Sequence, residues 1–359
     1  MKPDIRAPAA ITPDWLTAVL SEGGVEAEVR TFTATKVGTG QIGDSIRFVL
    51  DYKSAQEHAP RSLVGKFPSA GAESRQAGVS LGNYAREVKF YQYLAKTALI
   101  HTPRVYFTDV NDTTHDFVLM MEDLAPAVQG DQLKGVTLPQ AFLVMEEAAK
   151  LHGSHWQDDA LDDLAWVNGS KHATSPVSVE VVTGMWRGFC NRYGTRVTGE
   201  AARVGEILCA NIESYVRRSG PRCLIHQDFR PDNMMFASAE GGHPFTMLDW
   251  QSIAYGPGAT DIAYFLAGAI GAEERRKHER ELVDHYLAGL RPLGVKGYER
   301  RDFMRDYALG SFQLFLTAFF AAMIVTQTAR GDDMFFQMLN SAVAQIADTG
   351  ARALLLGRG

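Results

Sequence analysis

The amino-acid sequence predicts an α+β fold in two parts, a β-rich first part and a larger, mainly helical second part. Segments between residues 28 and 67 are rich in β-branched and aromatic residues, whereas most segments after residue 124 repeat apolar residues at helical spacing. The chain has 359 residues, and one hydrophobic core stops growing at about 250–300 residues. The sequence changes character at MMEDLAP without a Ser/Gly linker, so we expect two packed lobes, 1–123 and 124–359.

The first part contains the signals of one helix, several strands and a second helix. Thr12, Pro13 and Asp14 begin a helix over WLTAVL, since Thr caps helices and Pro suits the first helical position. Strands follow at VRTFTATKV, SIRFVLDY and SLVGKF, the first two joined by the glycine-rich turn GTGQIGD. A helical pattern covers 82–96, and two further strands are RVYFTDV and DFVLMME.

The second part is predicted to be helical except for one β-rich stretch. Helical patterns occupy 138–155, 185–193, 200–219, 273–290 and 301–327. The exception consists of CLIHQD, MMFAS and FTMLDW, where the last two indicate a hairpin.

Composition and charge narrow the classes of protein. The net charge of −6 and the pI of about 5.9 argue against a nucleic-acid surface, which is usually basic. The N-terminal residues lack the apolar region of a signal peptide. The longest apolar run, 314–325, is too short to span a bilayer and is typical of a buried helix. We therefore expect a cytoplasmic chain that binds neither nucleic acid nor membrane.

One constellation, IHQDFRPDNMMF at 225–236 followed by MLDWQ, carries the strongest chemical signal. Phosphoryl transfer needs a carboxylate at the attacking hydroxyl and Mg²⁺ on the phosphates. Asp228 and Asn233 are five residues apart, which suits a tight loop whose two ends face one metal. The predicted hairpin would return Asp249 to the same site, and Mg²⁺ prefers such oxygen ligands.

This order of residues resembles the kinase catalytic loop His-x-Asp-x-x-x-x-Asn and the Asp of the metal-binding Asp-Phe-Gly. It is more similar to the aminoglycoside phosphotransferase/choline kinase superfamily, and within that to the ecdysteroid-kinase-like branch. IHQDFRPDNMMF, MLDWQ, GPGATDIAYFL and VLMMEDL carry the resemblance, from Thr35 to at least Leu266. It implies a protein-kinase-like two-lobed fold, with a small β-rich N-lobe containing one key helix and a larger, mainly helical C-lobe.

The resemblance also implies roles for these residues. Asp228 would be the catalytic base, and Asn233 and Asp249 would bind Mg²⁺. Taken singly, each of the three is more typical of a loop-capping residue; their joint order favours catalysis. Gln227 replaces the glycine usual in the family, and its side chain could alter the backbone approach or contact the acceptor.

Two further residues are expected to order the catalytic loop. His226 is better explained as a hydrogen-bonding residue of the loop than as the base. Asp261, in GATDIAYF, resembles the acid that anchors the loop and opens a helix, and the structural alternative is a plain helix N-cap.

The first part would supply the nucleotide site. Gly38, Gly40 and Gly43, in GTGQIGDS, could place backbone N–H groups over phosphates, although glycines also make ordinary hairpins. Lys66 stands in an apolar strand, either reaching outward to solvent or lying at the α- and β-phosphates. Glu87, on the following helix, would pair with Lys66; alone it is typical of a solvated helix face.

Residues at the boundary between the parts are candidates for binding adenine. In the superfamily the hinge backbone hydrogen-bonds the base, which implies Met121, Glu122 and Leu124. Backbone contacts leave no side-chain signature in the sequence.

Several other features have plainer explanations. His152 and His155 lack a third metal ligand nearby and are expected to be structural. The acidic cluster 158–163 could attract a cation, but a solvated loop is favoured. Trp156, Trp166 and Trp186 could line an acceptor pocket, and core packing explains them equally well.

The sequence therefore predicts an ATP- and Mg²⁺-dependent phosphotransferase that acts on a hydroxyl of a small molecule. This acceptor is expected to have substantial apolar surface and not to be a polycation. A protein kinase is a weaker hypothesis, because eleven residues separate Asp249 from Asp261 and no Ala-Pro-Glu follows. Two further hypotheses are a nucleotide-binding scaffold without catalysis and a metal-dependent hydrolase. Neither the acceptor nor the oligomeric state follows from the sequence.

Overall fold

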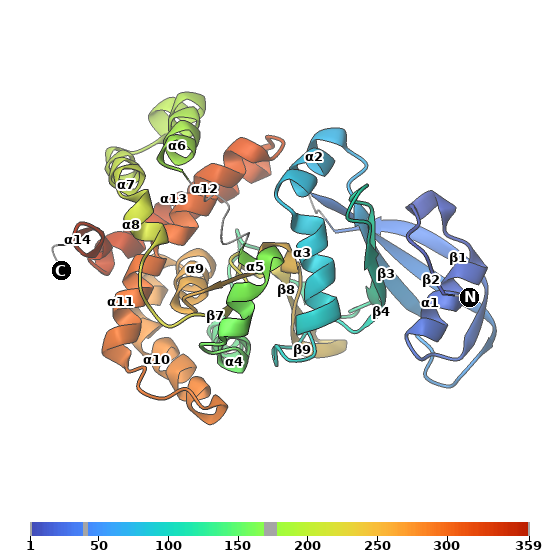
Figure 1. Ribbon diagram of the computed structural model, residues 1–359. Helices are drawn as coiled ribbons and strands as arrows, with labels where there is room; N and C mark the ends of the chain where they lie inside the picture. Colours follow the sequence, from blue (N-terminus) through green and yellow to red (C-terminus); the bar gives the residue numbers. More distant parts are fainter. Residues whose placement is uncertain (1, 39–41, 169–177, 358–359) are drawn as a thin grey trace. The chain divides into compact units, whose positions relative to one another are not determined.

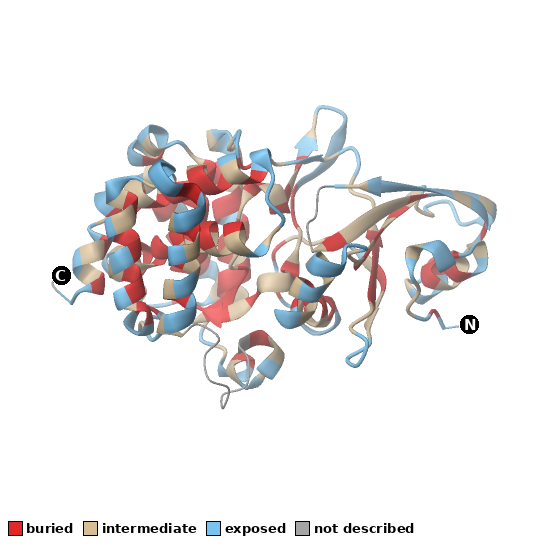
Figure 2. Cartoon of the chain, turned by 90° about the horizontal axis from the view of Figure 1, so that it is seen from above, coloured by how far each residue is buried: buried red, intermediate tan, exposed pale blue. Residues whose placement is uncertain are grey.

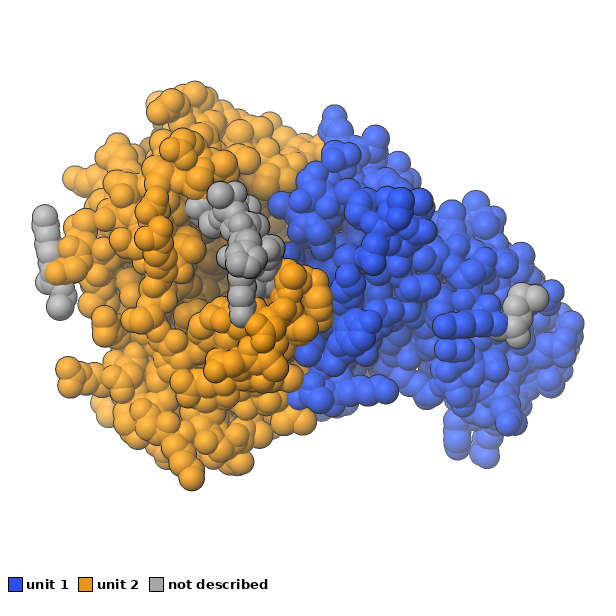
Figure 3. Space-filling model, viewed as in Figure 1, with its two compact units in different colours: residues 1–97, 101–128, 237–252 blue, residues 98–100, 129–236, 253–359 orange. Residues whose placement is uncertain are grey.

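The computed structural model describes residues 2–38, 42–168 and 178–357. It contains two compact units, which Figure 3 shows in different colours. The first consists of 1–97, 101–128 and 237–252, and the second of 98–100, 129–236 and 253–359. The units therefore differ from the continuous segments expected from the sequence, because 237–252 packs with the first unit.

The first unit is built on an antiparallel sheet with the strand order β1-β2-β3-β5-β4. Figure 1 shows this sheet with the first helices of the chain. The strands are β1 (Ala27–Val37), β2 (Gly43–Ala55), β3 (Ser62–Pro68), β4 (Val105–Val110) and β5 (Phe117–Glu122). The helices are α1 (Pro13–Glu22), α2 (Ala72–Ser80) and α3 (Asn83–Lys89), which continues as a π-helical turn over Phe90–Leu94.

Local sequence explains how the elements of the first unit form. The hydroxyl of Thr12 accepts a hydrogen bond from the backbone N–H of Trp15, so α1 begins as predicted. Its apolar side chains pack on the sheet in a core that includes Trp15, Phe48 and Phe67. In β3, buried and less buried residues alternate, which places Lys66 on the face opposite Phe67.

The second unit is mainly helical. Its longer helices are α4 (Leu138–Ser154), α6 (Val179–Tyr193), α7 (Gly199–Ala210), α9 (Ala259–Ala269), α10 (Ala272–Leu290), α11 (Arg300–Gly310), α12 (Phe312–Ile324) and α13 (Ala329–Asp348). Short helices are α5 (Ala165–Asn168), α8 (Ile212–Val216) and α14 (Ala351–Leu355). Figure 2 shows its buried residues concentrated where the helices face one another.

Short strands interrupt the helices at the predicted β-rich stretch. They are β6 (Val128–Gln129), β7 (Cys223–Ile225), β8 (Met234–Ser238), β9 (Gly241–Met247) and β10 (Ala254–Gly256). β7 pairs with β10 in an antiparallel manner, and the predicted hairpin is present as β8 and β9. The loop 226–233, which contains Asp228 and Asn233, lies between the end of β7 and the start of β8.

The apolar run 314–325 lies in α12, where Phe312, Leu314, Phe315, Ala318, Phe319 and Ala322 are buried. Among the described residues, one helical stretch, Arg300–Ile324, is long and apolar enough to cross a membrane by length and composition. Of the most apolar 18-residue segment in this stretch, 56% is buried inside the protein, as expected for a core helix. The predicted helix over 301–327 is in fact two helices, and α13 was not predicted.

The α+β class is confirmed, because the sheet and the helices are segregated along the chain.

Candidate active site

In the first unit, Lys66 occupies a central strand of the sheet. β3 pairs with β2 through Ser45 opposite Lys66 and with β5 through Leu119 opposite Lys66. Gly43 lies beside the lysine, where an added Cβ would come within 3.3 Å of Lys66 Cε and 3.1 Å of the Phe67 carbonyl oxygen. Gly43 therefore provides the room that the lysine side chain occupies.

Lys66 bridges two carboxylates. Its Nζ lies 2.7 Å from Glu87 Oε2 and 2.7 Å from Asp249 Oδ1. Burial works against the charge of Lys66, but Asp249 and Glu87 outweigh it and hold the pKa of the lysine above its ordinary value. The expected Lys66–Glu87 pair is present, and Asp249 is its third member.

Helix α3 also fixes the segment that follows Asp249. Arg86 Nη1 donates to the backbone oxygen of Gln251 at 2.9 Å. The rings of Phe90 and Trp250 stack with centroids 3.9 Å apart and planes inclined by 8°, and Trp250 is fully buried. Asp249 itself has φ of +67°, an uncommon conformation for a residue other than glycine. The surrounding contacts hold it there.

The other residues predicted to bind nucleotide are placed as follows. Gly38, directly after β1, has φ of +72°, a conformation that glycine adopts without steric cost. Gly40 lies outside the described residues. Met121 is buried in β5, and Glu122 ends that strand and accepts a hydrogen bond from the Arg104 backbone at 2.7 Å.

Leu124 follows in the connection to β6, where its backbone oxygen accepts from Ala127 N at 2.9 Å. The neighbouring carboxylate of Asp123 contacts Arg47 Nε at 2.6 Å and accepts from Ser62 Oγ at 2.7 Å. This connection is thus attached to β2 and β3, and its role toward adenine stays a prediction.

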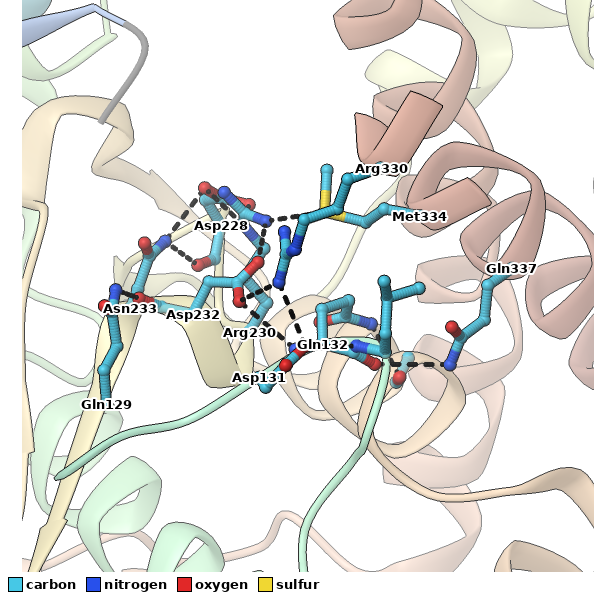
Figure 4. A network of polar contacts seen from close by, with 12 residues as sticks. Gln129, Asp131, Gln132, Asp228, Arg230, Asp232, Asn233, Arg330, Met334 and Gln337 are labelled. Atoms are coloured by element: carbon cyan, nitrogen blue, oxygen red, sulfur yellow. Dashed lines mark hydrogen bonds and ion pairs between the residues drawn. The ribbon is translucent and has the colours of Figure 1, made fainter. Parts of the chain in front are cut away.

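In the second unit, three side chains donate to the carboxylate of Asp228. Asn233 Nδ2 lies 2.9 Å from Oδ2, and Arg230 Nε lies 3.1 Å from the carboxylate (Figure 4). Tyr264 Oη lies 2.8 Å from Oδ1. Burial raises the pKa of Asp228, but the charge of Arg230 and the donated hydrogen bonds outweigh it, so the pKa lies below its ordinary value. Asp228 is therefore an ionised, oriented carboxylate at neutral pH.

Asp261 holds the start of the same loop. Its carboxylate accepts from the backbone N–H groups of His226 at 2.7 Å and Gln227 at 2.9 Å. It also lies 3.3 Å from His152 Nε2, and all of these groups except Gln227 are fully buried. The helix N-cap hypothesis for Asp261 is wrong: Gly258 is the N-cap of α9, and Asp261 reaches across to the loop instead.

Gln227 has a backbone conformation that is unusual for a residue with a side chain. Its φ is +65°, in the left-handed region that favours glycine. The hydrogen bond from its backbone N–H to the buried Asp261 carboxylate holds this conformation, so the loop keeps its turn without a glycine.

The two histidines are structural, as expected. Fully buried His152 lies between Asp261 and Tyr286, whose hydroxyl is 2.9 Å from Nδ1. His155 Nδ1 lies 3.0 Å from the Asp158 carboxylate. Among the described residues, no group of three or more His, Cys, Asp or Glu could hold a metal ion.

The donors predicted for Mg²⁺ nevertheless suit that ion. Asn233 Nδ2 donates to Asp228, so the amide oxygen of Asn233 is the atom that would bind the ion. Asp249 already has a cation, Lys66 Nζ, at 2.7 Å from one oxygen. Both are hard oxygen donors of the kind that Mg²⁺ uses together with phosphate and water. Asn233 belongs to the second unit and Asp249 to the first.

Sequence reasoning missed three residues around Asp228. Tyr264 lies one helical turn after Asp261 on α9, and Arg230 lies two residues after Asp228 within the loop itself. Met334, on α13, places its sulfur 3.2 Å from Arg230 Nη1. The i, i+3 spacing of Asp261 and Tyr264 could have identified the tyrosine, since such residues share a helix face.

Solved structures with low sequence identity share the fold. A candidate aminoglycoside phosphotransferase from Ralstonia eutropha is 14% identical, with a TM-score of 0.56 over 93% of this chain and 97% of that one. An ethanolamine kinase from Plasmodium vivax is 12% identical, with a TM-score of 0.52 over 96% and 84%. The GDP complex of aminoglycoside 2'-phosphotransferase-IIIa is 12% identical, with a TM-score of 0.51 over 93% and 98%.

These similarities show a protein-kinase-like fold with a β-sheet N-terminal part and a helical C-terminal part. No curated protein sequence gave a significant match. The profile of the Phosphotransferase enzyme family (APH) matches residues 55–303, more than half of the chain. The matched segment contains Lys66, Asp228 and Asp249. The chain belongs to the phosphotransferase enzyme family.

Proposed function

We propose that the protein is an ATP-dependent phosphotransferase that moves the γ-phosphoryl group to a hydroxyl of a small molecule. The observation that carries this proposal is the environment of Asp228. An ionised carboxylate with hydrogen bonds to both oxygens, and with 23% of its side chain exposed, is both oriented and accessible. A general base for a hydroxyl needs these two properties.

Asp228 would accept the proton of the acceptor hydroxyl during transfer. The bond between the acceptor oxygen and the γ-phosphorus forms while the bond from that phosphorus to the bridging oxygen breaks, which releases ADP. Because its pKa is lowered, Asp228 is a weak base, so orienting the hydroxyl is its first task and taking the proton comes late in the step.

Asn233 and Asp249 would hold Mg²⁺. Bound there, the ion would neutralise charge on the β- and γ-phosphates. Lys66 would shift from Asp249 to the phosphates while Glu87 keeps it in place, since Glu87 is the more buried partner, with 2% exposure against 24%. His226 and Asp261 would order the catalytic loop.

Gly38, Gly40 and Gly43 would cover the phosphates, and the backbone of Met121, Glu122 and Leu124 would bind the adenine. A structurally similar phosphotransferase has GDP bound, so GTP must be compared with ATP. The finer resemblance to the ecdysteroid-kinase-like branch, and a cytoplasmic location, stay predictions.

We propose a small hydroxylated acceptor with substantial apolar surface. The acidic cluster 158–163 supports this, because two of its four aspartates already pair with basic side chains: Asp158 contacts His155, and Asp162 contacts Arg222 at 2.9 Å. Carboxylates that serve the fold are poor candidates for binding a polycation.

A thermal-shift titration followed by a transfer assay tests the function. Mg·ATP, or Mg·GTP, should raise the Tm of the protein. ADP release should then depend on an alcohol from a panel of hydroxylated metabolites, sterols, amino alcohols and aminoglycosides. Asp249→Ala should lose the Mg²⁺-dependent part of the stabilisation, which calorimetry measures directly.

Each competing hypothesis predicts a different result. A nucleotide-binding scaffold would be stabilised by Mg·ATP without phosphorylating any acceptor, and a hydrolase would not be stabilised by it. Phosphorylation of proteins but of no small alcohol would indicate a protein kinase. Unchanged Mg·ATP binding in Asp249→Ala would remove Asp249 from the metal site.

A further inference from the structure

The carboxylates close to Asp228 in the second unit are paired with basic side chains, two arginines and, at Asp131, also the exposed Lys134 at 3.7 Å. Arg230 Nη1 lies 2.7 Å from Asp232, while its Nε contacts Asp228. Arg330, in the first turn of α13, places Nη2 3.0 Å from Asp131 and 3.7 Å from Asp232. Figure 4 shows this chain of contacts, which leads from Asp228 through Arg230 and Asp232 to Arg330. We call these five residues the compensated cluster: Asp131, Asp228, Asp232, Arg230 and Arg330.

Acids elsewhere on the first turns of α13 are also engaged. Asp332 accepts hydrogen bonds from Tyr193 Oη at 2.6 Å and from Gln327 Nε2 at 2.8 Å. Asp333 lies 3.7 Å from Arg196. The stretches outside the described residues, 1, 39–41, 169–177 and 358–359, contain no Asp or Glu in the sequence. They therefore supply no acidic side chain.

The compensated cluster is a poor environment for a positive charge. A cation that leaves water needs a carboxylate whose charge is not already satisfied, because desolvation is otherwise not offset. Here a cation would have to displace a guanidinium that is already paired. Arg330 is 53% exposed, so it is also the positive group of the cluster most open to solvent.

We propose that Arg330 is a specificity-determining residue that makes the acceptor site select uncharged alcohols over ammonium-bearing ones. This inference rests on the proposed function, because it requires that the acceptor hydroxyl lies at Asp228. Arg330 occupies two carboxylates that would otherwise attract an ammonium group. Its removal should leave Asp131 with the exposed and more distant Lys134, 3.7 Å away, and should release part of the charge of Asp232, which favours cationic acceptors.

One pair of alcohols separates charge from shape. Choline and its carbon isostere, in which a tert-butyl group replaces the trimethylammonium group, have the same size and hydroxyl position. The ratio of kcat/KM for the isostere to that for choline should exceed one in the unchanged protein. In Arg330→Met it should fall by about fivefold, the effect of about 1 kcal/mol for one exposed charge pair at 4 Å. Arg330→Lys should restore the ratio.

The chain offers a matched control on the same unit. Arg276, on α10, is also 53% exposed and also pairs with a carboxylate, Asp348, at 2.9 Å. Arg276→Met should leave the ratio unchanged. If both methionine variants shift the ratio equally, a general change in surface charge is responsible, and the proposal for Arg330 fails.

A binding measurement works even if neither alcohol is phosphorylated. Calorimetry with kanamycin, a polycation, should give no saturable binding to the unchanged protein and measurable binding to Arg330→Met. Saturable binding of kanamycin to the unchanged protein would overturn the inference, as would a preference for choline over its isostere. Failure of the proposed function is a separate outcome: it would appear as no transfer to any alcohol despite bound Mg·ATP.

Discussion

Asp228 and Asp249 are carboxylates of nearly equal exposure, but they differ in the contacts that hold them. Their side chains are 23% and 24% exposed. Asp228 receives three donors from residues of its own unit, two of them on the catalytic loop and one on α9. Asp249 instead pairs with Lys66, and Lys66 also pairs with Glu87.

The difference suits two different tasks. Several short donors from packed side chains fix the orientation of a carboxylate, as a base that must meet a hydroxyl requires. A single cation at one oxygen can instead be exchanged for another cation, as a metal ligand requires. Local backbone strain occurs at both places, at Gln227 before Asp228 and at Asp249 itself, and such strain is common at functional sites.

The largest expected effect separates Asp228 from the other acid of its loop. Asp228→Asn should lower kcat by about 10²–10⁴-fold, since a general base is lost, while calorimetry shows unchanged Mg·ATP affinity. Asp232→Asn is the matched control with an uncharged alcohol, because Asp232 shares Arg230 with Asp228 but would not accept the proton of the acceptor hydroxyl. Near-normal turnover in Asp228→Asn, or an equal loss in Asp232→Asn, would contradict the assignment.

The shared lysine allows stability and nucleotide binding to be separated. Lys66→Met should lower the free energy of unfolding by about 3 kcal/mol, because Glu87 and Asp249 are left without their cation. Adding Glu87→Gln should recover much of that loss, since one carboxylate is removed. Mg·ATP affinity should stay low in both variants.

Chemical denaturation and calorimetry measure the two quantities. If the double variant regains nucleotide affinity along with stability, then Lys66 acts only through folding. If neither variant changes nucleotide affinity, then Lys66 does not contact the nucleotide.

The sequence identified the residues that form the central contacts of the candidate site better than the residues that support them. Lys66, Glu87 and Asp228 could be identified because motif order and spacing along the chain reveal them. Met334 could not be assigned in the same way, since it reaches the loop through the packing of α13, and for Tyr264 the one signal is its i, i+3 spacing from Asp261 on α9. No motif singles out Arg86, yet this residue is part-buried and bonded to the backbone of Gln251.

Sequence-based prediction of the fold was limited in a similar way, because it missed how helices are divided and capped. The apolar pattern over 301–327 predicts one helix, because it continues through Ser311, but the chain breaks there into α11 and α12. α13 was missed although Phe335, Met338, Leu339, Ala342 and Ile346 recur at helical spacing. Its charged first turn, ARGDD, obscured that pattern, and the same turn carries Arg330.

A smaller effect tests whether hydrogen bonds orient Asp228. Tyr264→Phe should lower kcat by about threefold to tenfold with little change in KM, because one donor to the carboxylate is lost.

Tyr307→Phe is the matched control: Tyr307 is equally buried and its hydroxyl donates to Glu279 at 2.5 Å, a contact outside the loop 226–233. Both variants should lose similar stability in thermal denaturation, and only Tyr264→Phe should lose kcat. Equal kcat in the two variants would show that Tyr264 serves the fold alone.

The smallest expected effect concerns the support of Asp249 by helix α3. Arg86 and Lys89 are three residues apart on this helix, yet only Arg86 is bonded to the Asp249 segment, whereas Lys89 lies 3.5 Å from exposed Asp112. Arg86→Met should therefore weaken Mg·ATP binding severalfold, since one hydrogen bond contributes about 1 kcal/mol. The affinity for ATP without Mg²⁺ should change less, because Arg86 positions the proposed metal ligand Asp249 and not the backbone that is proposed to bind adenine. Lys89→Met should change neither affinity. If Arg86→Met and Lys89→Met bind Mg·ATP equally well, the stacked rings of Phe90 and Trp250 are sufficient to hold the segment, and the arginine is dispensable for placing Asp249.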